Sequence, residues 1–357
     1  LVRGLDQKRG YGQMKKKKMP LILMGILILF VLTIVVAGGL IWSKLSLLQF
    51  DTGASSPAGH DVLDVQAFHE SEPAVQEEQL QGLQEEATEP RIPQTSMKQE
   101  KNVLNILLIG TDERTKKFSK KARSDSMILV SVNINAKTVK LVSLERGMGV
   151  PVLAGPHKGE WDWLTHIFAY GGADLLMQTI EECFRVEVDR YIRVNFNTVT
   201  TAIDAIGGIE MDLSAAEAKF YTSELNNPKK TGMNHLNGEE TLMFARLRAI
   251  DSDWQRVERQ RKVILAVKEK LKNVGLSELN QLSNQVLPLI QTNMTKTELL
   301  ELILYCPDFI RSTFTQMTLP KHGTYGFRTG MEGREYFAAD FDENSRILKE
   351  FLYGATD

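Results

Sequence analysis

The sequence predicts an α/β protein with a central mixed β-sheet flanked by helices. Three apolar runs of strand length follow one another after residue 101, and the first of them ends at Gly110. Helical patterns then alternate with further short strand-like runs, as is typical of this class. The formal net charge is −2, with 43% hydrophobic and 25% charged residues, which is ordinary for a globular protein. No overall positive field indicates a nucleic-acid partner.

The N-terminal part of the sequence predicts a membrane anchor. Residues 21–42 carry no charge and are long enough to cross a bilayer. Four lysines, residues 15–18, precede them and predict a cytoplasmic tail over residues 1–20, with the rest of the chain outside the cell. The apolar segment exceeds the ~7–15 residues usual for a cleaved signal peptide. We therefore predict an uncleaved transmembrane signal-anchor and a single-pass protein of the cell membrane.

The next segment, residues 43–101, is rich in glutamate, glutamine, proline and serine, and poor in large apolar side chains. Such a composition buries too little surface to offset the entropy lost on ordering. We predict a flexible, disordered acidic linker that holds the folded part away from the membrane.

The folded part begins at residue 102. Apolar periodicity and turn residues predict strands at residues 102–110, 126–134, 138–144, 191–194, 209–213 and 314–319. The same signals predict helices at residues 173–183, 197–206, from 238–244, from 253, at about 277–290, at 296–305 and at 343–353.

The first three strands place polar residues together. Asp112 follows the first strand, Asp125 precedes the second, and Arg146 follows the third; Arg123 belongs to the loop between the first two. Short connections imply strands running up, down and up, so these side chains collect at one rim of the sheet. Carboxylates hold a hard cation and arginines take phosphate oxygens, which indicates a site for Mg²⁺ and a polyphosphate. The alternative is an ion-paired surface hairpin.

A second basic feature is the arginine-rich stretch at residues 244–272. Read as a strand, Arg246 and Arg248 project from the same face. A helical pattern begins at about residue 253, with Gln260 inside its apolar face and Arg256 at the edge. The guanidinium fork suits phosphate, which favours an anionic ligand. The alternative is an ion-paired helix with a solvated basic face.

Other chemistries find little support. The sequence shows no His/Cys cluster with zinc spacing, no Walker A loop and no nucleophile elbow. The two cysteines, Cys183 and Cys306, could pair outside the cell or remain buried thiols.

Taken together, these segments resemble the LytR-CpsA-Psr (LCP) family of bacterial cell-envelope proteins. The matching pieces include NILLIGTDER, RSDSMILVSVN, KTVKLVSLER, FAYGGADLL, VNFNTVTTAIDAIGGIEMDL and DSDWQRVERQRKVI, in that order. The resemblance covers residues 102–272 as the core. It makes residues 273–357 the C-terminal part of one extracytoplasmic LCP-like catalytic domain, residues 102–357.

The resemblance implies a phosphotransferase of cell wall biogenesis. Such enzymes move a glycopolymer, such as a teichoic acid, from an undecaprenyl-pyrophosphate carrier onto the N-acetylmuramic acid 6-hydroxyl of peptidoglycan. It implies Mg²⁺ bound by Asp112 and Asp125. It also implies pyrophosphate binding by Arg123, Arg146, Arg246, Arg248, Arg256 and Gln260, of which Arg146, Arg246 and Arg248 are the expected catalytic residues. Arg259 and Arg261 are expected on a solvated face.

The chain departs from the family pattern in two places. It has Asp162-Trp163-Leu164-Thr165-His166 where the family frequently has Lys and Asn before its Ala-Tyr-Gly-Gly segment. Glu145-Arg146-Gly147 stands where the family commonly has Pro-Arg-Asp, so the general base stays open. Asp253 is expected to orient Arg256 or Arg246. One alternative is a non-catalytic protein that binds polyprenyl pyrophosphates or wall polymers. Another is an envelope-linked transcriptional regulator or attenuator, although the predicted topology keeps the basic helix away from DNA.

Overall fold

The computed structural model describes residues 49–50, 90–113, 118–119, 122–274, 282 and 284–354. All of them belong to the second of two compact units, Lys44–Asp357. The predicted transmembrane segment (residues 21–42) and most of the predicted linker (residues 43–101) lie outside this part of the chain. Within the part that is described, no helix combines the length and apolar character needed to cross a membrane.

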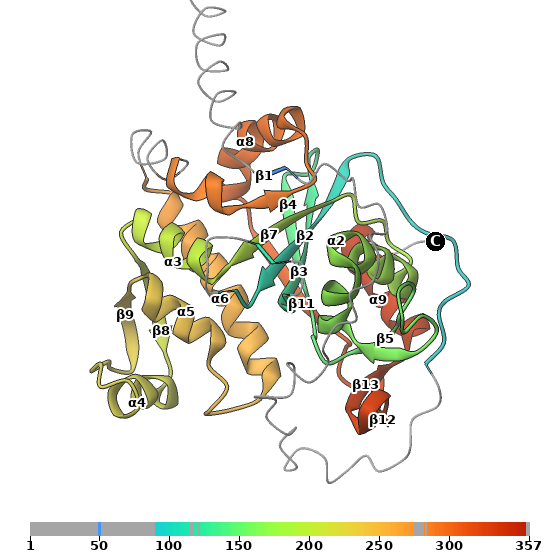
Figure 1. Cartoon of the computed structure of the whole chain (residues 1–357). Helices are drawn as coiled ribbons and strands as arrows, with labels where there is room; N and C mark the ends of the chain where they lie inside the picture. Colours follow the sequence, from blue (N-terminus) through green and yellow to red (C-terminus); the bar gives the residue numbers. More distant parts are fainter. Residues whose placement is uncertain are drawn as a thin grey trace, which may run out of the picture. The chain divides into compact units, whose positions relative to one another are not determined.

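A seven-stranded mixed sheet forms the centre of the fold, as predicted (Figure 1). Its order is β1-β10-β7-β2-β3-β4-β11. The strands are β1 (Gln49–Phe50), β2 (Val103–Thr111), β3 (Ser124–Asn133), β4 (Thr138–Leu144), β7 (Arg190–Asn195), β10 (Gln291–Thr292) and β11 (Phe314–Leu319). The β2–β3 and β3–β4 pairs are antiparallel, whereas β7 and β11 join parallel to β2 and β4. The predicted up-down-up course of the first three long strands is therefore confirmed.

The remaining elements surround this sheet. Three two-stranded pairs are β5 (Gly149–Pro151) with β6 (Trp161–Trp163), β8 (Ile209–Leu213) with β9 (Gly232–Leu236), and β12 (Tyr325–Thr329) with β13 (Glu335–Ala339). The helices are α2 (Leu164–Phe184), α3 (Phe196–Ala205), α4 (Ala215–Ser223), α5 (Gly238–Arg246), α6 (Asp253–Leu271), α8 (Lys296–Arg311) and α9 (Phe341–Tyr353). Short 3-10 turns lie at Leu287–Leu289 and Met331–Gly333.

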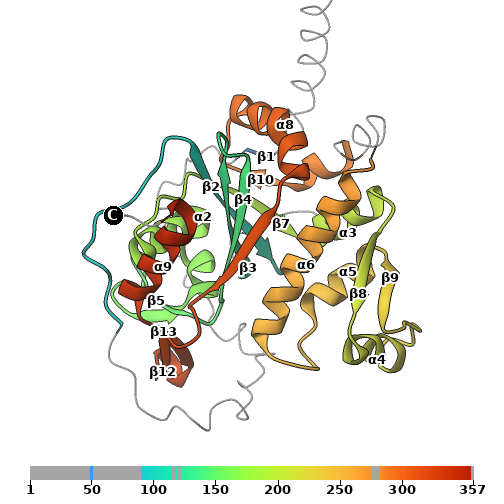
Figure 2. The same ribbon diagram turned by 180° about the vertical axis from the view of Figure 1, so that it is seen from behind.

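Helices cover both faces of the sheet. Helices α2 and α9 lie on one side, and α3, α5 and α6 lie on the other, as the two opposite views show (Figures 1 and 2). The strand period of two explains this layering. Leu107 and Ile109 of β2 are wholly buried in the core that contains α2 and α9, whereas Leu108 packs in the cluster that includes Ile264 of α6.

A second core supports the layer on the α6 side. It joins α3, α4, α5 and the β8–β9 pair, and it includes Ile209, Tyr221 and Phe244. Helix α6 belongs to both regions, because Val263 packs in this second core while Ile264 packs toward the sheet. The helix is therefore fixed over the sheet face on which the candidate site lies.

Two local expectations differ from the structure. Helix α2 starts at Leu164 rather than at residue 173, because Gly171 and Gly172 interrupt its geometry and hide the earlier turns from a periodicity search. The strand interpretation of residues 246–248 is wrong. Helix α5 is favoured by a capping box at Asn237 and runs through Arg246. Of the predicted helix at 277–290, residues 277–281 and 283 lie outside the described residues, residues 282 and 284–286 are helical, and a 3-10 turn follows at Leu287–Leu289. Cys183 is a free, buried thiol.

Candidate functional site

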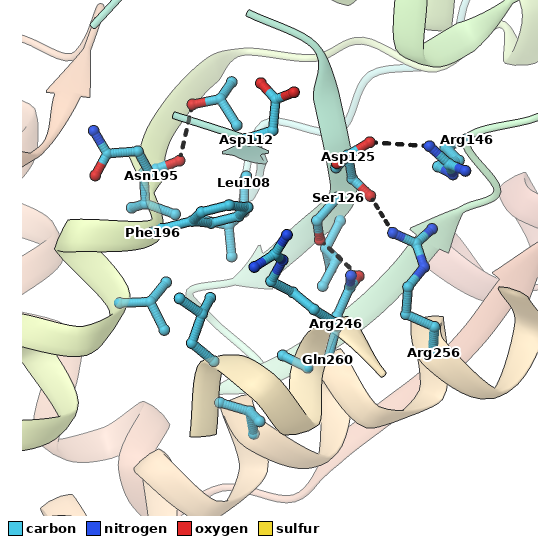
Figure 3. Close-up of a pocket in the computed structure, with 18 of the residues that line it drawn as sticks. Leu108, Asp112, Asp125, Ser126, Arg146, Asn195, Phe196, Arg246, Arg256 and Gln260 are labelled. Carbon is cyan, nitrogen blue, oxygen red and sulfur yellow. Dashed lines mark hydrogen bonds and ion pairs between the residues drawn. The ribbon is translucent and has the colours of Figure 1, made fainter. Parts of the chain in front are cut away.

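A cavity of about 550 Å³ opens between the ends of β2 and β3 and the helices α3, α5 and α6 (Figure 3). It has a polar end and an apolar end. The lining includes all eight of the predicted site residues: Asp112, Arg123, Asp125, Arg146, Arg246, Arg248, Arg256 and Gln260. The strand β3 and the segments that border β2, β3 and β4 contribute the first four, and the α5–α6 segment contributes the last four. The site arises only where these two parts meet.

Asp112 lies just beyond the end of β2, next to a register shift in the β2–β3 pair. The Arg123 backbone N–H donates to Asp112 Oδ1 at 3.3 Å, and Arg123 Nε lies 3.9 Å from Asp112 Oδ2. Burial raises the pKa of the Asp112 carboxyl, and the negative charge of Asp125 raises it further. Two carboxylates thus approach closely enough to repel each other, which is a geometry that a cation would stabilise.

Asp125 is held from two directions (Figure 3). Arg146 Nη1 donates to its Oδ1 at 3.1 Å, and Arg256 Nη1 donates to its backbone oxygen at 2.9 Å. Arg146 comes from the segment after β4 and Arg256 from α6. These contacts fix the Asp125 side chain at the rim predicted from the strand directions.

Asp253, the first residue of α6, gathers three arginines. Its carboxylate accepts from Arg256 Nη2 at 2.7 Å and forms ion pairs with Arg248 Nε at 3.2 Å and Arg146 Nε at 3.5 Å. Burial alone would raise the pKa of Asp253, but a hydrogen bond from Glu145 and the three guanidinium charges hold it well below its usual range. The expected contact with Arg256 is present; among the described contacts of Asp253, the other partners are Arg146 and Arg248 rather than Arg246.

The arginine cluster carries more positive charge than Asp253 offsets. Burial lowers the pKa of Arg248 to about 10, and repulsion from Arg256 and Arg146 adds to this effect. A guanidinium is costly to bury beside two others unless an anion joins them. The electrostatics of this end of the cavity therefore favour a ligand that carries several negative charges.

Arg246 and Gln260 complete the polar wall. The Arg246 guanidinium lies 4.2 Å from the centre of the Phe196 ring, a cation–π arrangement. The Ser126 hydroxyl donates to Gln260 Oε1 at 2.8 Å. This bond orients an amide that the helical pattern places on an otherwise apolar face (Figure 3).

Arg259 and Arg261 do not lie on a solvated face, contrary to expectation. They are 2% and 8% exposed. Arg259 donates to Glu217 at 2.7 Å and to the Leu247 carbonyl at 2.7 Å, and Arg261 donates to Ser143 at 2.8 Å. Their partners come from other elements, so the burial of these two arginines could not be predicted from the local charge pattern. Both arginines stabilise the packing of α6 and take no part in the cavity lining.

The apolar end of the cavity is lined by Leu108, Ile128, Val194, Phe196, Val199, Leu242, Ala245, Val263 and Ile264. Sequence analysis did not identify these residues. The lining residues on the strands alternate with residues that face α2. The lining residues on the helices can be recognised only after α3, α5 and α6 have packed over the sheet. A cavity that joins a cationic end to an apolar end suits an amphiphilic ligand with an anionic head.

Gly147 has no side chain to act at the site. A Cβ atom placed there would lie 3.4 Å from the Phe337 ring, and the Phe337 backbone N–H donates to the Gly147 carbonyl at 3.1 Å. In this chain the space beside Arg146 is therefore bordered by an aromatic ring of β13.

Asp112 and Asp125 are the available carboxylates for a cation in the cavity lining. Among the described residues, no group of three or more His, Cys, Asp or Glu side chains is arranged to hold a metal. Mg²⁺ commonly binds one or two carboxylates and keeps its other positions for water and substrate phosphates. The mutually repelling pair fits that donor set and does not fit an all-protein metal cage.

The chain is similar to known proteins over most of its length. The profile of the LytR_cpsA_psr family matches residues 66–351. The chain is 30% identical to a protein of Oceanobacillus iheyensis over 94% of each chain, and 31% identical to one of Bacillus cereus over 56% of this chain and 63% of that one. Both relatives are named polyisoprenyl-teichoic acid–peptidoglycan teichoic acid transferase TagU. The alignment with the Bacillus cereus protein thus spans less than two thirds of its length.

Solved structures show the same fold. The crystal structure of TagV from B. subtilis matches with a TM-score of 0.58 at 26% identity, over 72% of this chain and 100% of that chain. A structure of TagT bound to LI-WTA matches with a TM-score of 0.56 at 26% identity, over 71% of this chain and 91% of that chain.

Proposed function

The chain belongs to the LytR-CpsA-Psr family of transferases, and from that premise we propose that it transfers a glycopolymer from a polyprenyl-pyrophosphate carrier onto peptidoglycan. One observation carries the proposal. A single cavity joins a cluster of arginines and two carboxylates to an apolar end. A lipid-linked pyrophosphate has the matching order of parts: an anionic head and a long apolar tail.

Each part of the cavity has a distinct task in this proposal. The apolar end takes the first isoprenoid units, and Arg146, Arg246 and Arg248 bind pyrophosphate oxygens, with Arg123, Arg256 and Gln260 beside them. Asp112 and Asp125 would hold Mg²⁺, which supplies additional charge neutralisation when bound. The protein would act mainly by positioning and electrostatic stabilisation, because phosphoryl transfer requires little covalent chemistry from side chains.

The proposed reaction balances as a simple displacement. The acceptor hydroxyl oxygen forms a bond to the phosphorus that carries the glycan, and its proton passes to solvent or to the departing polyprenyl phosphate. The bond from that phosphorus to the bridging oxygen breaks, and polyprenyl phosphate leaves. Charge builds on the non-bridging and bridging oxygens during this step, and the guanidinium groups that Asp253 holds would stabilise it.

Purified protein tests the proposal directly. Incubated with lipid-linked wall polymer and a peptidoglycan acceptor, it should release polyprenyl phosphate only when Mg²⁺ is present. Arg248→Ala should abolish release, because a charge-assisted contact to phosphate is lost. Arg346→Ala is the matched control, since Arg346 is an arginine on the exposed side of α9. Tight lipid binding without any release would refute the enzyme and favour a non-catalytic binding protein.

We also propose that residues 21–42 anchor the protein in the cell membrane with the catalytic domain outside. The support is the uncharged sequence of this segment and the lysines at 15–18. A reporter that is active only outside the cytoplasm, fused after Asp357, should be active. Activity of a cytoplasm-specific reporter at that position would overturn the proposed topology.

A further inference from the structure

Glu145 is the most unusual buried group beside the proposed site. It directly follows β4, and its side chain is 1% exposed. Its backbone N–H donates to the Leu319 carbonyl at 2.8 Å. Yet among the described residues no hydrogen-bond donor reaches either oxygen of its carboxyl group. A buried carboxylate without donors would be costly, so this group needs a specific explanation.

The groups around Glu145 explain how its carboxyl group can be buried. The charged and titratable groups that face it are Arg146 in its own segment, Asp253 and Arg256 of α6, and Tyr325 of β12. Burial raises the pKa of Glu145 well above its usual range, and the neighbouring charge of Asp253 raises it further. Asp253 shifts in the opposite direction, because it accepts the hydrogen bond from Glu145 and faces several guanidinium groups. The burial of Glu145, its carboxyl oxygens without donors and these opposite shifts all favour a proton on Glu145 rather than on Asp253.

We propose that Glu145 is a positioning residue for the arginine cluster: as an uncharged acid it donates a hydrogen bond to Asp253, which in turn holds Arg146, Arg248 and Arg256 toward the ligand. The inference deepens the proposed function, because it takes these arginines as phosphate ligands. It explains how one carboxylate can be fixed among three guanidinium groups without a second negative charge. The cluster then keeps its surplus positive charge for the substrate.

Anion binding should therefore depend on pH. Once the pH rises above the raised pKa of Glu145 and its carboxyl group loses the proton, a second negative charge stands behind the arginines and the hydrogen bond to Asp253 is lost. Both changes weaken anion binding. Glutamine at this position has nearly the same shape and donates a hydrogen bond through its amide, but it cannot ionise. Comparing Glu145→Gln with the wild type therefore shows the effect of ionisation while the shape of the side chain is kept.

The first measurement concerns the carboxyl group itself. Infrared spectra of the full-length protein at neutral pH should contain a carbonyl band of a protonated carboxylic acid. Glu145→Gln should remove it, and Glu301→Gln, which alters an exposed glutamate of α8, should not. A band that persists in Glu145→Gln, or that is absent from the wild type, would overturn the assignment. This readout depends on neither binding nor turnover.

The second measurement is the affinity for inorganic pyrophosphate as a function of pH. Wild-type affinity should fall at least about fivefold as pH rises through the pKa of Glu145, as expected for one added charge near the site. Glu145→Gln should lack this fall once the ionisation of pyrophosphate itself, which is common to all variants, is subtracted, and Glu145→Ala should bind more weakly throughout. Identical profiles for wild type and Glu145→Gln would refute the positioning role.

The two measurements keep this inference distinct from the proposed function. If no variant binds pyrophosphate, the phosphate site is wrong and so is the positioning role, whereas the carboxyl band still reports the protonation of Glu145. If binding is normal but polymer transfer is absent, the enzyme assignment fails while Glu145 retains its role. Should Glu145→Ala not fold, the conservative glutamine variant still decides the question.

Discussion

Ser126 of β3 donates a 2.8 Å hydrogen bond to Gln260 of α6 and so joins two walls of the cavity, although 134 positions separate them in the chain. Such a bond ties the end of the central hairpin to the helix that presents Arg256. The cavity is therefore held by a specific polar contact in addition to the apolar packing of α6.

This contact should be measurable as a coupling energy. In a double-mutant cycle of Ser126→Ala and Gln260→Ala, we expect about 1 kcal/mol of interaction in the free energy of unfolding, because each single change leaves a polar partner unsatisfied. Urea denaturation of the four proteins gives the value. Additive effects of the two substitutions would mean that the bond does not contribute to stability.

Asp253→Asn should destabilise the fold by about 3 kcal/mol, because it leaves buried guanidinium groups without their carboxylate. The pKa of Asp253 is depressed in the folded state. Its contribution is therefore present above the unfolded pKa of about 3.9 and is lost as pH falls through the folded value. The difference from wild type should accordingly shrink below about pH 4 in thermal denaturation. Asp308→Asn, which breaks a partly exposed pair with Lys137, should change stability by less than about 1 kcal/mol.

Metal binding should depend on pH through Asp112. Since burial and Asp125 raise its pKa, Asp112 becomes protonated at a higher pH than an ordinary aspartate. Mg²⁺ affinity measured by calorimetry should therefore decline on mild acidification. Asp112→Asn and Asp125→Asn should each lower the affinity at least about tenfold, since one of two ligands is lost. Asp174→Asn, an exposed change on α2, is the control, and unaltered titrations in the first two variants would exclude them as ligands.

The apolar end of the cavity can be tested separately from the polar end. Ala245→Trp places a large ring in the space between α5 and the sheet and should weaken binding of a lipid-linked donor at least about tenfold, since several methylene groups lose their site. Inorganic pyrophosphate should bind as in the wild type. Ala216→Trp, on the exposed side of α4, should affect neither ligand. Equal loss of both ligands in Ala245→Trp would show that the substitution damages the whole cavity.

Arg259 should prove to be a structural residue. Arg259→Met leaves the buried Glu217 carboxylate without its ion-pair partner and should lower the free energy of unfolding by about 3–5 kcal/mol. Adding Glu217→Leu should restore part of the loss, because the uncompensated charge is then removed. Urea denaturation of both variants measures the effect. A negligible loss in Arg259→Met would instead support the solvated basic face predicted from the sequence.

The sequence by itself determined most secondary-structure elements and which polar residues meet at one edge of the sheet. Apolar runs of strand length predict β2, β3 and β4, and the short connections between them favour antiparallel neighbours. This alone brings Asp112, Asp125 and Arg146 to one edge. The arginine-rich stretch drew attention to Arg246, Arg248, Arg256 and Gln260, the family resemblance assigned them to the same site, and the structure places them in the same cavity.

Only the tertiary structure decided how each charge is used. Arg256 and Arg259 lie three positions apart on α6 and look alike in the sequence, yet one lines the cavity and the other is buried against Glu217. The pKa values of Asp253 and Glu145 likewise shift in opposite directions because of burial and neighbouring charge. These differences come from contacts between residues far apart in the chain, and local periodicity carries no information about such contacts. The packing of α6 on the sheet determines these contacts and therefore the chemistry of the site.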